Sequence, residues 1–344
     1  MVYVLDDLTA VDATSRANGL SDVYVGESLN AAARMRQHLA SMEKRHLTSA
    51  RFIVDDTFNK SVCLDLESYL IRMLAGDGTH RVLNRNDGIV DADYYDRDRY
   101  RQTFQEVFGE LKDMGLFTRS IPAIENSDLF KLSPFKTLTH DQAAAVEDIL
   151  EGLFDDFSTG AGSTVVLQGD PGTGKTVVAI YLLKLLRDIA DTTPPDGLDS
   201  DSLFSDFFAE GFRELIVGKR FGLVVPQQSL RDSIKKVFRR TPGLHPDMVL
   251  TAFDVGSAGE DFDLLIVDEA HGLNQRASQS SGVQNKKFRL ITERLFHFDD
   301  KTKTQLDWIL AKSRHQIFLL DAHQSIRPAD IPLAVVPREV VNAG

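Results

Sequence analysis

Residues 169–176 read Gly-Asp-Pro-Gly-Thr-Gly-Lys-Thr and fit the pattern G-x-x-x-x-G-K-[ST] at every position. The apolar run STVVLQ precedes this segment, and the helix-forming run VVAIYLLKLLR follows it. A glycine-rich turn between a strand and a helix directs backbone N–H groups at phosphate oxygens, with the positive end of the helix dipole behind them. The sequence therefore predicts a phosphate-binding loop on a strand–turn–helix unit.

Every residue of this loop is a candidate binding residue. We expect Lys175 to reach the β- and γ-phosphates of a nucleotide, and Thr176 to offer its hydroxyl to Mg²⁺. The other candidate positions are Gly169, Asp170, Pro171, Gly172, Thr173 and Gly174.

The second half of the chain alternates apolar strands with helical stretches. From residue 136 onward the runs STVVLQG, FGLVVP, MVLTAFD, FDLLIVDE and HQIFLLD are short and almost continuously apolar. Strands of this kind are buried on both faces, as in a mainly parallel sheet covered by helices. The segment 188–211 interrupts the alternation, contains no Lys or Arg, and is expected to form an acidic, partly flexible loop.

Two further strand ends carry polar residues that fit the same site. The strand FDLLIV ends in DEAH (268–271), and HQIFLLD ends in DAHQ (321–324). The carboxyl ends of parallel strands lie beside the ligand crevice of an α/β sheet. We expect Asp268 to hold the metal, and Glu269 to orient the attacking water or take its proton. The second cluster, with Gln324, is expected to sense the γ-phosphate.

Gln142 stands in LTHDQ (138–142), just before the helical run AAAVEDIL. Its amide has one donor and one acceptor and would fit the edge of adenine. The same position also suits a residue that caps the helix. Beside the other motifs we favour the adenine contact.

Composition limits the alternatives. At 344 residues the length predicts about two domains. With 39 Lys and Arg against 51 Asp and Glu, the net charge is −12, which argues against binding to nucleic acid through bulk positive charge. A single cysteine, Cys63, excludes an internal disulfide and a multi-cysteine metal site. No apolar run reaches the ~18 residues of a membrane span, and the N-terminus does not resemble a secretion signal, so we expect a cytoplasmic protein without a membrane partner.

The first hundred or so residues combine short β-rich runs with helices. We expect strands at 2–5, 22–27 and 51–57, and helices at 30–47 and 63–76, the second ending at Gly76. A charged stretch at 91–102 marks the edge of this unit. Residues 103–135 are expected to form a connecting helix and a loop.

This first unit contains the residue types that one-metal hydrolysis of a phosphodiester requires. A carboxylate holds Mg²⁺, a phenol or imidazole handles the proton of the attacking water, and an arginine stabilises the charged oxygens. The candidates are Tyr3, Tyr24, Arg34, His38, Glu67 and Asn84. Each alone also has an ordinary interpretation: a tyrosine at the edge of a core, a solvated helix charge, or an asparagine that caps a turn, for which Asn86 competes.

Taken in order, VYV (2–4), YVGES (24–28), NAAARMRQHL (30–39), LESYLI (66–71) and VLN (82–84) resemble the GIY-YIG nuclease domain over roughly residues 1–95. The resemblance implies that Tyr3 and Tyr24 are the two motif tyrosines and that Arg34 is the catalytic arginine. It also implies that Glu67 is the metal ligand, that Asn84 is the structural or catalytic asparagine, and that His38 assists proton transfer.

Residues 136–332 resemble the core of superfamily 1 helicases, and specifically the bacterial Schlafen-related, helicase-like P-loop domain. The resemblance implies that Gln142 reads adenine, that 169–176 is Walker A, that 268–271 is Walker B, and that the third motif begins at residue 321. In that family a second RecA-like lobe supplies arginines that complete the ATP site. The sequence ends 20 residues after Gln324, so we expect that lobe to be absent or supplied by a further chain.

The predicted fold class is α/β, with three segments. Residues 1–102 form a small nuclease domain of the GIY-YIG type, 103–135 form the linker, and 136–344 form a RecA-like P-loop lobe with a mainly parallel sheet. We expect a metal-dependent endonuclease that uses Mg²⁺ or Mn²⁺, is gated by ATP, and acts on nucleic acid, with DNA as the expected substrate. Defence against foreign DNA is a hypothesis from this pairing of domains.

Two alternatives remain open. The first is an ATP-dependent nucleic-acid-binding or assembly module with an inactive nuclease half. The second is a fragment that needs a partner lobe. In the second half, the best basic cluster for nucleic acid is KKVFRR (235–240), which would otherwise be a solvated helix face.

Overall fold

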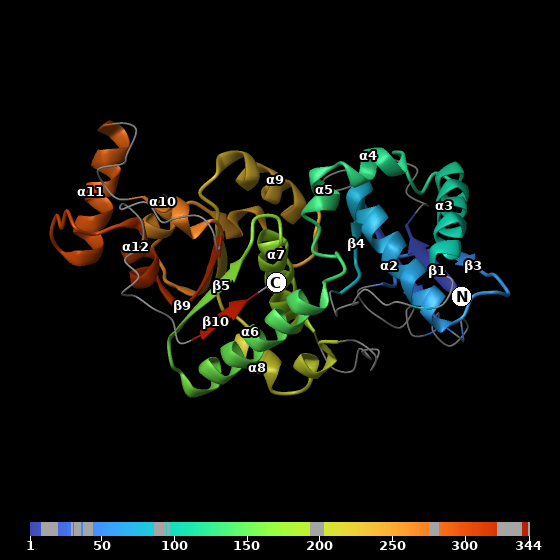
Figure 1. Ribbon diagram of the computed structural model, residues 1–344, viewed down its shortest axis with the longest axis horizontal. Coiled ribbons are helices and arrows are strands. Elements are labelled where there is room, and N and C mark those ends of the chain that lie inside the picture. Colours follow the sequence, from blue (N-terminus) through green and yellow to red (C-terminus); the bar gives the residue numbers. More distant parts are fainter. Residues whose placement is uncertain are drawn as a thin grey trace.

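The computed structural model shows two units side by side along the long axis of the molecule (Figure 1). It describes residues 1–7, 20–28, 30, 36, 44–85, 94, 97–192, 203–274, 282–321 and the backbone of 339–342. The smaller unit contains the N-terminus, and the larger one contains the phosphate-binding loop. In the part of the chain that is described, no helix is both long and apolar enough to cross a membrane.

The N-terminal unit is built on a four-stranded sheet of order β3-β1-β2-β4. Strand β1 pairs antiparallel with β2 and β3, and β4 is parallel to β2. The strands are β1 (Val2–Asp6), β2 (Ser21–Glu27), β3 (Ser49–Ile53) and β4 (His80–Val82). The strands expected at 2–5 and 22–27 are confirmed, whereas the one expected at 51–57 ends at Ile53.

Successive side chains of β1 point to opposite faces of this sheet. Val2 and Val4 pack in a hydrophobic cluster with residues of α2 (Lys60–Asp77). Tyr3 and Leu5 point to the opposite face and form a second, smaller cluster. The tyrosine face and the face covered by α2 are therefore separate.

Helix α2 extends slightly beyond the predicted end at Gly76. It begins at Asn59, whose side chain accepts a hydrogen bond from the Val62 amide, and it ends at Gly78, which adopts φ 78°. Only glycine takes that left-handed conformation without strain, so Gly78 ends the helix. Gly76 has a packing role instead, because a Cβ there would lie 2.7 Å from a methyl group of Ile124.

The segment predicted to connect the domains also contributes to the N-terminal core. It contains α4 (Ile121–Glu125), α5 (Asp128–Lys131) and most of α3 (Arg97–Asp113). Phe104, Phe108 and Leu111 of α3 are buried in the same cluster as the valines of β1. The connection is therefore packed against α2 rather than a bare linker. The domain boundaries themselves stay a prediction.

The larger unit is a sheet of order β10-β5-β9-β8-β6-β7, in which every recorded pairing is parallel. Its strands are β5 (Ser163–Gly169), β6 (Phe221–Val224), β7 (Val249–Leu250), β8 (Phe262–Val267), β9 (Ser313–Asp321) and β10 (Glu339–Asn342). Five were predicted from apolar runs, and β10 was not.

Both faces of this sheet are covered. Along β8, Leu264 and Ile266 join the cluster that contains α6 and α7, whereas Leu265 and Val267 join the cluster that contains α10 and α12. The helices are α6 (His140–Thr159), α7 (Lys175–Asp191), α8 (Phe212–Ile216), α9 (Gln228–Phe238), α10 (Ala252–Ser257), α11 (Gly282–Phe296) and α12 (Gln305–Lys312). A parallel sheet buried between helix layers, with a phosphate loop after β5, is the RecA-like α/β arrangement predicted from the sequence.

Two local predictions need correction. The apolar run 248–254 is a strand only at Val249–Leu250, because Thr251 and Asp254 form a capping box that starts α10. The acidic insertion 188–211 was expected to be loop-like. Its first residues belong to α7, and Phe204 and Phe207 near its end are buried in the lobe's main core. Aromatic packing therefore fixes that end of the insertion.

Candidate functional site

The phosphate-binding loop joins the carboxyl end of β5 to the start of α7. Gly172 and Gly174 have φ values of 86° and 84°, which only glycine adopts readily. The Thr173 amide donates to the Asp170 carbonyl at 3.2 Å and closes the turn. Since α7 begins at Lys175, its unpaired N-terminal amides lie at this loop, where an anion would be stabilised.

Lys175 is buried and held by three oxygen atoms. Its Nζ donates to the carbonyl oxygens of Gly169 and Asp170 at 2.8 and 2.9 Å. It also forms an ion pair with Oδ1 of Asp321 at 2.5 Å. These contacts match the three N–H donors of an ammonium group. Asp321 lies in this position because β9 pairs with β5 in a register that places it opposite Gly169.

Thr176 and Asp268 bring the two predicted nucleotide motifs together. The Thr176 hydroxyl donates to Oδ2 of Asp268 at 2.7 Å, and the Asp268 amide donates to the carbonyl of Val224 on β6. Burial raises the pKa of the Asp268 carboxyl, against the opposing effect of the Thr176 hydrogen bond. A hydroxyl and a buried carboxylate are hard oxygen ligands of the kind Mg²⁺ prefers, and the cation would relieve the cost of that buried charge. The donor set therefore fits the metal.

Glu269 follows Asp268 in a strained conformation, with φ 48° and ψ 49°. Its Oε2 lies 2.8 Å from Nε2 of His271, and the carboxylate is partly exposed. Among the described residues, Nδ1 of His271 is buried without a hydrogen-bond partner. Non-glycine residues with positive φ occur preferentially at functional sites, where the surrounding structure holds the strain. The contact with His271 therefore fixes the carboxylate of the residue that follows Asp268.

Gln142 contacts the phosphate loop through its amide. It forms a capping box with Thr139 at the start of α6, and its Nε2 donates to the Thr173 carbonyl at 2.7 Å. A Cβ at Gly174 would lie 2.8 Å from that nitrogen. The structure thus shows the helix-capping role, and the adenine contact stays a prediction. Gln324 lies outside the described residues.

In the N-terminal unit the two predicted tyrosines lie together. The ring centroids of Tyr3 and Tyr24 are 6.3 Å apart, and Nζ of Lys44 lies 3.6 Å from the centroid of the Tyr24 ring. Tyr3 pairs with Gly26 across the β1–β2 ladder. A Cβ at Gly26 would lie 2.3 Å from the Tyr3 hydroxyl oxygen. The absence of a side chain at Gly26 therefore gives the phenol its space.

The other predicted residues of this unit are less closely gathered. Asn84 is buried, accepts from the Val25 amide at 3.0 Å, and donates to the Val25 carbonyl at 2.7 Å, which is a structural role. Glu67 is half-buried on α2, the helix attached to the opposite face of the sheet from the tyrosines. Arg34 and His38 lie outside the described residues. Within the described residues, no group of three or more His, Cys, Asp or Glu side chains is placed to hold a metal.

The fold and the loop define the larger unit as a RecA-like P-loop domain. Residues 162–332 match the family model described as Schlafen group 3, DNA/RNA helicase domain. This match supports the predicted helicase-like lobe and suggests nucleotide binding, and with it a nucleic-acid partner and a possible NTPase activity. It begins after α6 and does not bear on the N-terminal unit. No curated protein matches the chain.

Proposed function

We propose that the P-loop lobe binds and hydrolyses ATP with Mg²⁺, and that its nucleotide state controls cleavage of nucleic acid, expected to be DNA, by the N-terminal unit. The hydrogen bond between Thr176 and Asp268 carries the nucleotide part of this proposal. The start of α7 and the end of β8 supply these two oxygen ligands, from residues 92 apart in sequence, at one point. A loop that bound phosphate only by its backbone would not need the buried carboxylate of Asp268.

The residues of the lobe divide the chemistry among them. Lys175 would leave its present partners to neutralise phosphate oxygens, while Thr176 and Asp268 would hold Mg²⁺, which would supply further positive charge to the phosphates. Glu269 would orient the attacking water or accept its proton, with His271 holding the carboxylate in place. Nucleotide selectivity for adenine would come from Gln142 if its amide turns from Thr173 to the base.

The nuclease part of the proposal is supported by the tyrosine pair and by the resemblance to GIY-YIG domains. Gly26 leaves room for the Tyr3 hydroxyl, which is buried beside Tyr24. By the resemblance, these phenols would handle the proton of an attacking water. In this proposal Arg34, His38 and Glu67 supply the charge, the proton transfer and the metal ligand.

Contacts between the two units support control by nucleotide. On α9, Ser233 donates to Asp128 of α5 at 2.6 Å, and just beyond that helix Nε of Arg240 donates to the Gly78 carbonyl at 3.1 Å. A positive charge at the carbonyl end of a helix is stabilising. At the other end of α9, Arg231 donates to the carbonyls of Val225 and Pro226, directly after β6. One helix therefore reaches from the nucleotide site to the end of α2, which carries Glu67.

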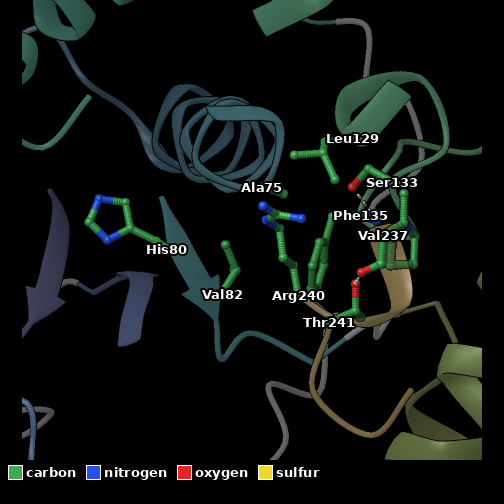
Figure 2. Close-up of a pocket in the computed structure, with 10 residues that line it drawn as sticks. Ala75, His80, Val82, Leu129, Ser133, Phe135, Val237, Arg240 and Thr241 are labelled. Carbon is green, nitrogen blue, oxygen red and sulfur yellow. Dashed lines mark hydrogen bonds between the residues drawn. The ribbon is translucent and has the colours of Figure 1, made fainter. Parts of the chain in front are cut away.

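Figure 2 shows this junction as a small pocket lined by both units. Ala75, Val82 and Leu129 face Val237 and Arg240, and the guanidinium group of Arg240 lies close to Ala75. The end of α2 is thus held by apolar packing and by the hydrogen bond from Arg240. A movement of α9 would reach α2 through this contact.

The test measures two activities of the full chain with Mg²⁺ or Mn²⁺. ATP hydrolysis should be abolished by Lys175→Ala and retained by the exposed control Lys236→Ala. Cutting of supercoiled plasmid should be lost in Glu67→Ala and retained in Glu110→Ala, and ATP should change its rate in wild type. Arg240→Ala should remove that ATP effect, whereas the neighbouring exposed Arg239→Ala should not. Wild-type protein that neither hydrolyses ATP nor cuts plasmid would refute the proposal.

The second candidate is an ATP-dependent nucleic-acid-binding module with an inactive N-terminal half. The placement of Glu67 on α2, the helix attached to the opposite face of the sheet from the two tyrosines, favours it. It predicts ATP hydrolysis that depends on Lys175, binding of DNA, and no cutting in any lane. Glu67→Ala would then change neither binding nor hydrolysis.

A further inference from the structure

Helix α11 extends from one end of the P-loop lobe (Figure 1). Its inner side is fixed by apolar packing, because Phe288 and Ile291 are buried against Trp308. The indole N–H of Trp308 donates to the Thr292 hydroxyl at 3.2 Å. The helix is thus firmly held on one side and presents its other side outward.

The outward side of α11 is basic in an acidic protein. The helix contains four Lys and Arg residues and one acidic residue, Glu293, whereas the whole chain has a net charge of −12. The four basic side chains are all exposed: Lys286, Lys287, Arg289 and Arg294. Val283 and Leu290 lie among them with 80% and 50% exposure. Residues 286, 289 and 290 follow helical spacing (i, i+3, i+4) and so share one face.

Most of these basic groups keep donors available. Arg289 pairs with Glu293 at 3.7 Å, and Arg294 donates to the Gly256 carbonyl. Each contact uses only part of a guanidinium group with five N–H donors. Nζ of Lys287 lies 5.3 Å from the ring centroid of Phe253. These contacts position the side chains without satisfying their full hydrogen-bonding capacity.

An exposed aromatic residue follows the helix at its carboxyl end. Phe298 is 61% exposed, and the residue before it, His297, has a φ of 68°. The Asp300 amide donates to the Phe298 carbonyl at 2.9 Å, and the Asp300 carboxylate accepts from the amide and hydroxyl of Thr302. The Asp300 carboxylate is therefore hydrogen-bonded within the turn, and the strained turn at His297 precedes the exposed phenyl ring.

We propose that the outer face of α11, together with Phe298, binds single-stranded nucleic acid. Lys286 and Arg289 contact phosphates, and Phe298 stacks on a base. Only an unpaired strand offers a free base face for stacking, so the exposed ring selects single strands over duplex. The inference rests on the proposed function in that nucleic acid is the substrate.

The rival basic cluster on α9 fits this role less well. Arg231 and Arg240 are engaged with backbone carbonyls of the lobe and of α2. Lys236 and Arg239 remain exposed, with no aromatic residue recorded against them among the described contacts. They provide matched controls, since both pairs are exposed basic residues on, or directly after, a helix of the same lobe.

The experiment measures fluorescence anisotropy of labelled oligothymidylate and of a duplex with the full chain, in EDTA and without nucleotide, from 50 to 200 mM salt. Lys286→Ala/Arg289→Ala should weaken strand binding about tenfold and reduce the slope of log affinity against log salt by about 1.4, at ~0.7 per lost phosphate contact. Phe298→Ala should weaken it between about fivefold and 150-fold. Lys236→Ala/Arg239→Ala should change it less than about twofold.

Three results would overturn the inference: no strand binding by wild type, equal losses in the α9 and α11 pairs, or tighter binding of duplex than of single strand. Thermal unfolding of each variant, followed by Trp308 fluorescence, checks that the α11 packing is intact. If the protein cuts plasmid but its strand binding does not depend on α11, this inference is wrong and the proposed function stands. If α11 binds single strands but the protein neither cuts plasmid nor hydrolyses ATP, the proposed function is wrong and this inference stands.

Discussion

Gly26→Ala should destabilise the N-terminal unit. The new Cβ would lie 2.3 Å from the Tyr3 hydroxyl oxygen, 2.4 Å from the ring carbon that carries it, and 3.0 Å from a ring carbon of Tyr24. Tyr3 is fully buried, so its ring has no open space into which to turn. Overpacking of a core costs about 1–3 kcal/mol, and displacement of an aromatic ring adds to that. We expect a loss of about 3 kcal/mol in the free energy of unfolding.

The assay separates the two units by their chromophores. The single tryptophan, Trp308, lies in the P-loop lobe, so its fluorescence reports that lobe during urea unfolding, while far-UV circular dichroism reports both units. Gly26→Ala should shift only the transition that tryptophan does not detect. Gly109→Ala is the matched control: no atom lies within 4 Å of its added Cβ in α3, and it should stabilise by about 0.5–1 kcal/mol.

A double-mutant cycle makes the reasoning refutable. In a Tyr3→Leu background the clash is relieved, and Gly26→Ala should then cost less than about 1 kcal/mol. An equal cost in both backgrounds would show that the close approach of Tyr3 is not the cause. A Gly26→Ala protein within about 0.5 kcal/mol of wild type would refute the packing argument itself.

Three other substitutions test separate features. Asn84→Ala should cost about 2–4 kcal/mol in urea unfolding, because it leaves the buried N–H and C=O of Val25 unpaired; a cost below 0.5 kcal/mol would contradict this. Asp321→Asn removes the anion that competes with phosphate for Lys175, so the Kd for ATP by calorimetry should fall about threefold to thirtyfold, and an unchanged or weaker affinity would be inconsistent with it. Burial lowers the pKa of His315 from 6.5, so folded protein resists its protonation and stability is lost as pH falls below that value. His315→Gln should flatten the dependence of the unfolding free energy on pH between pH 7 and 5. A variant whose curve runs parallel to that of the wild type would disprove this.

The nucleotide motifs were predictable because each is local in sequence. The loop at 169–176 and the acidic pair at Asp268 follow strands that apolar runs reveal, and parallel strands bring their carboxyl ends to one edge. The contact between Lys175 and Asp321 depends on the β5–β9 register, which no local pattern determines. The sequence placed Asp321 in a polar cluster at this edge without identifying its partner.

Gln142 shows a signal that sequence reasoning undervalued. Thr139 and Gln142 stand three residues apart before an apolar helix, which is the pattern of a capping box. The neighbouring nucleotide motifs favour an adenine contact for the same residue. The capping hydrogen bonds are local and form in any nucleotide state, whereas the contact with Thr173 depends on the tertiary placement of α6 beside the loop.

The basic run 235–240 shows what a pattern of charges in the sequence cannot predict. In sequence it is one uniform cluster, but the helix directs its members to different surroundings, so that Arg240 meets α2 while Lys236 and Arg239 remain exposed. Counting charges along a helix cannot separate an interdomain contact from a ligand surface. The basic residues of α11 are more dispersed in sequence, yet the helix presents them on exposed positions around an apolar stripe.

Backbone strain connects the two places where we expect ligands. Among the described residues, Glu269 and His297 are the non-glycine residues with positive φ. Each such residue costs roughly 1–3 kcal/mol, and the surrounding structure must supply that energy. The strained Glu269 follows Asp268 and pairs with His271, and the strained His297 precedes the exposed ring of Phe298. His297→Gly removes the strain at the second of these residues. It should therefore raise the free energy of unfolding while it weakens the binding of single-stranded nucleic acid. Loss of both together would indicate that the turn serves only to fold the lobe.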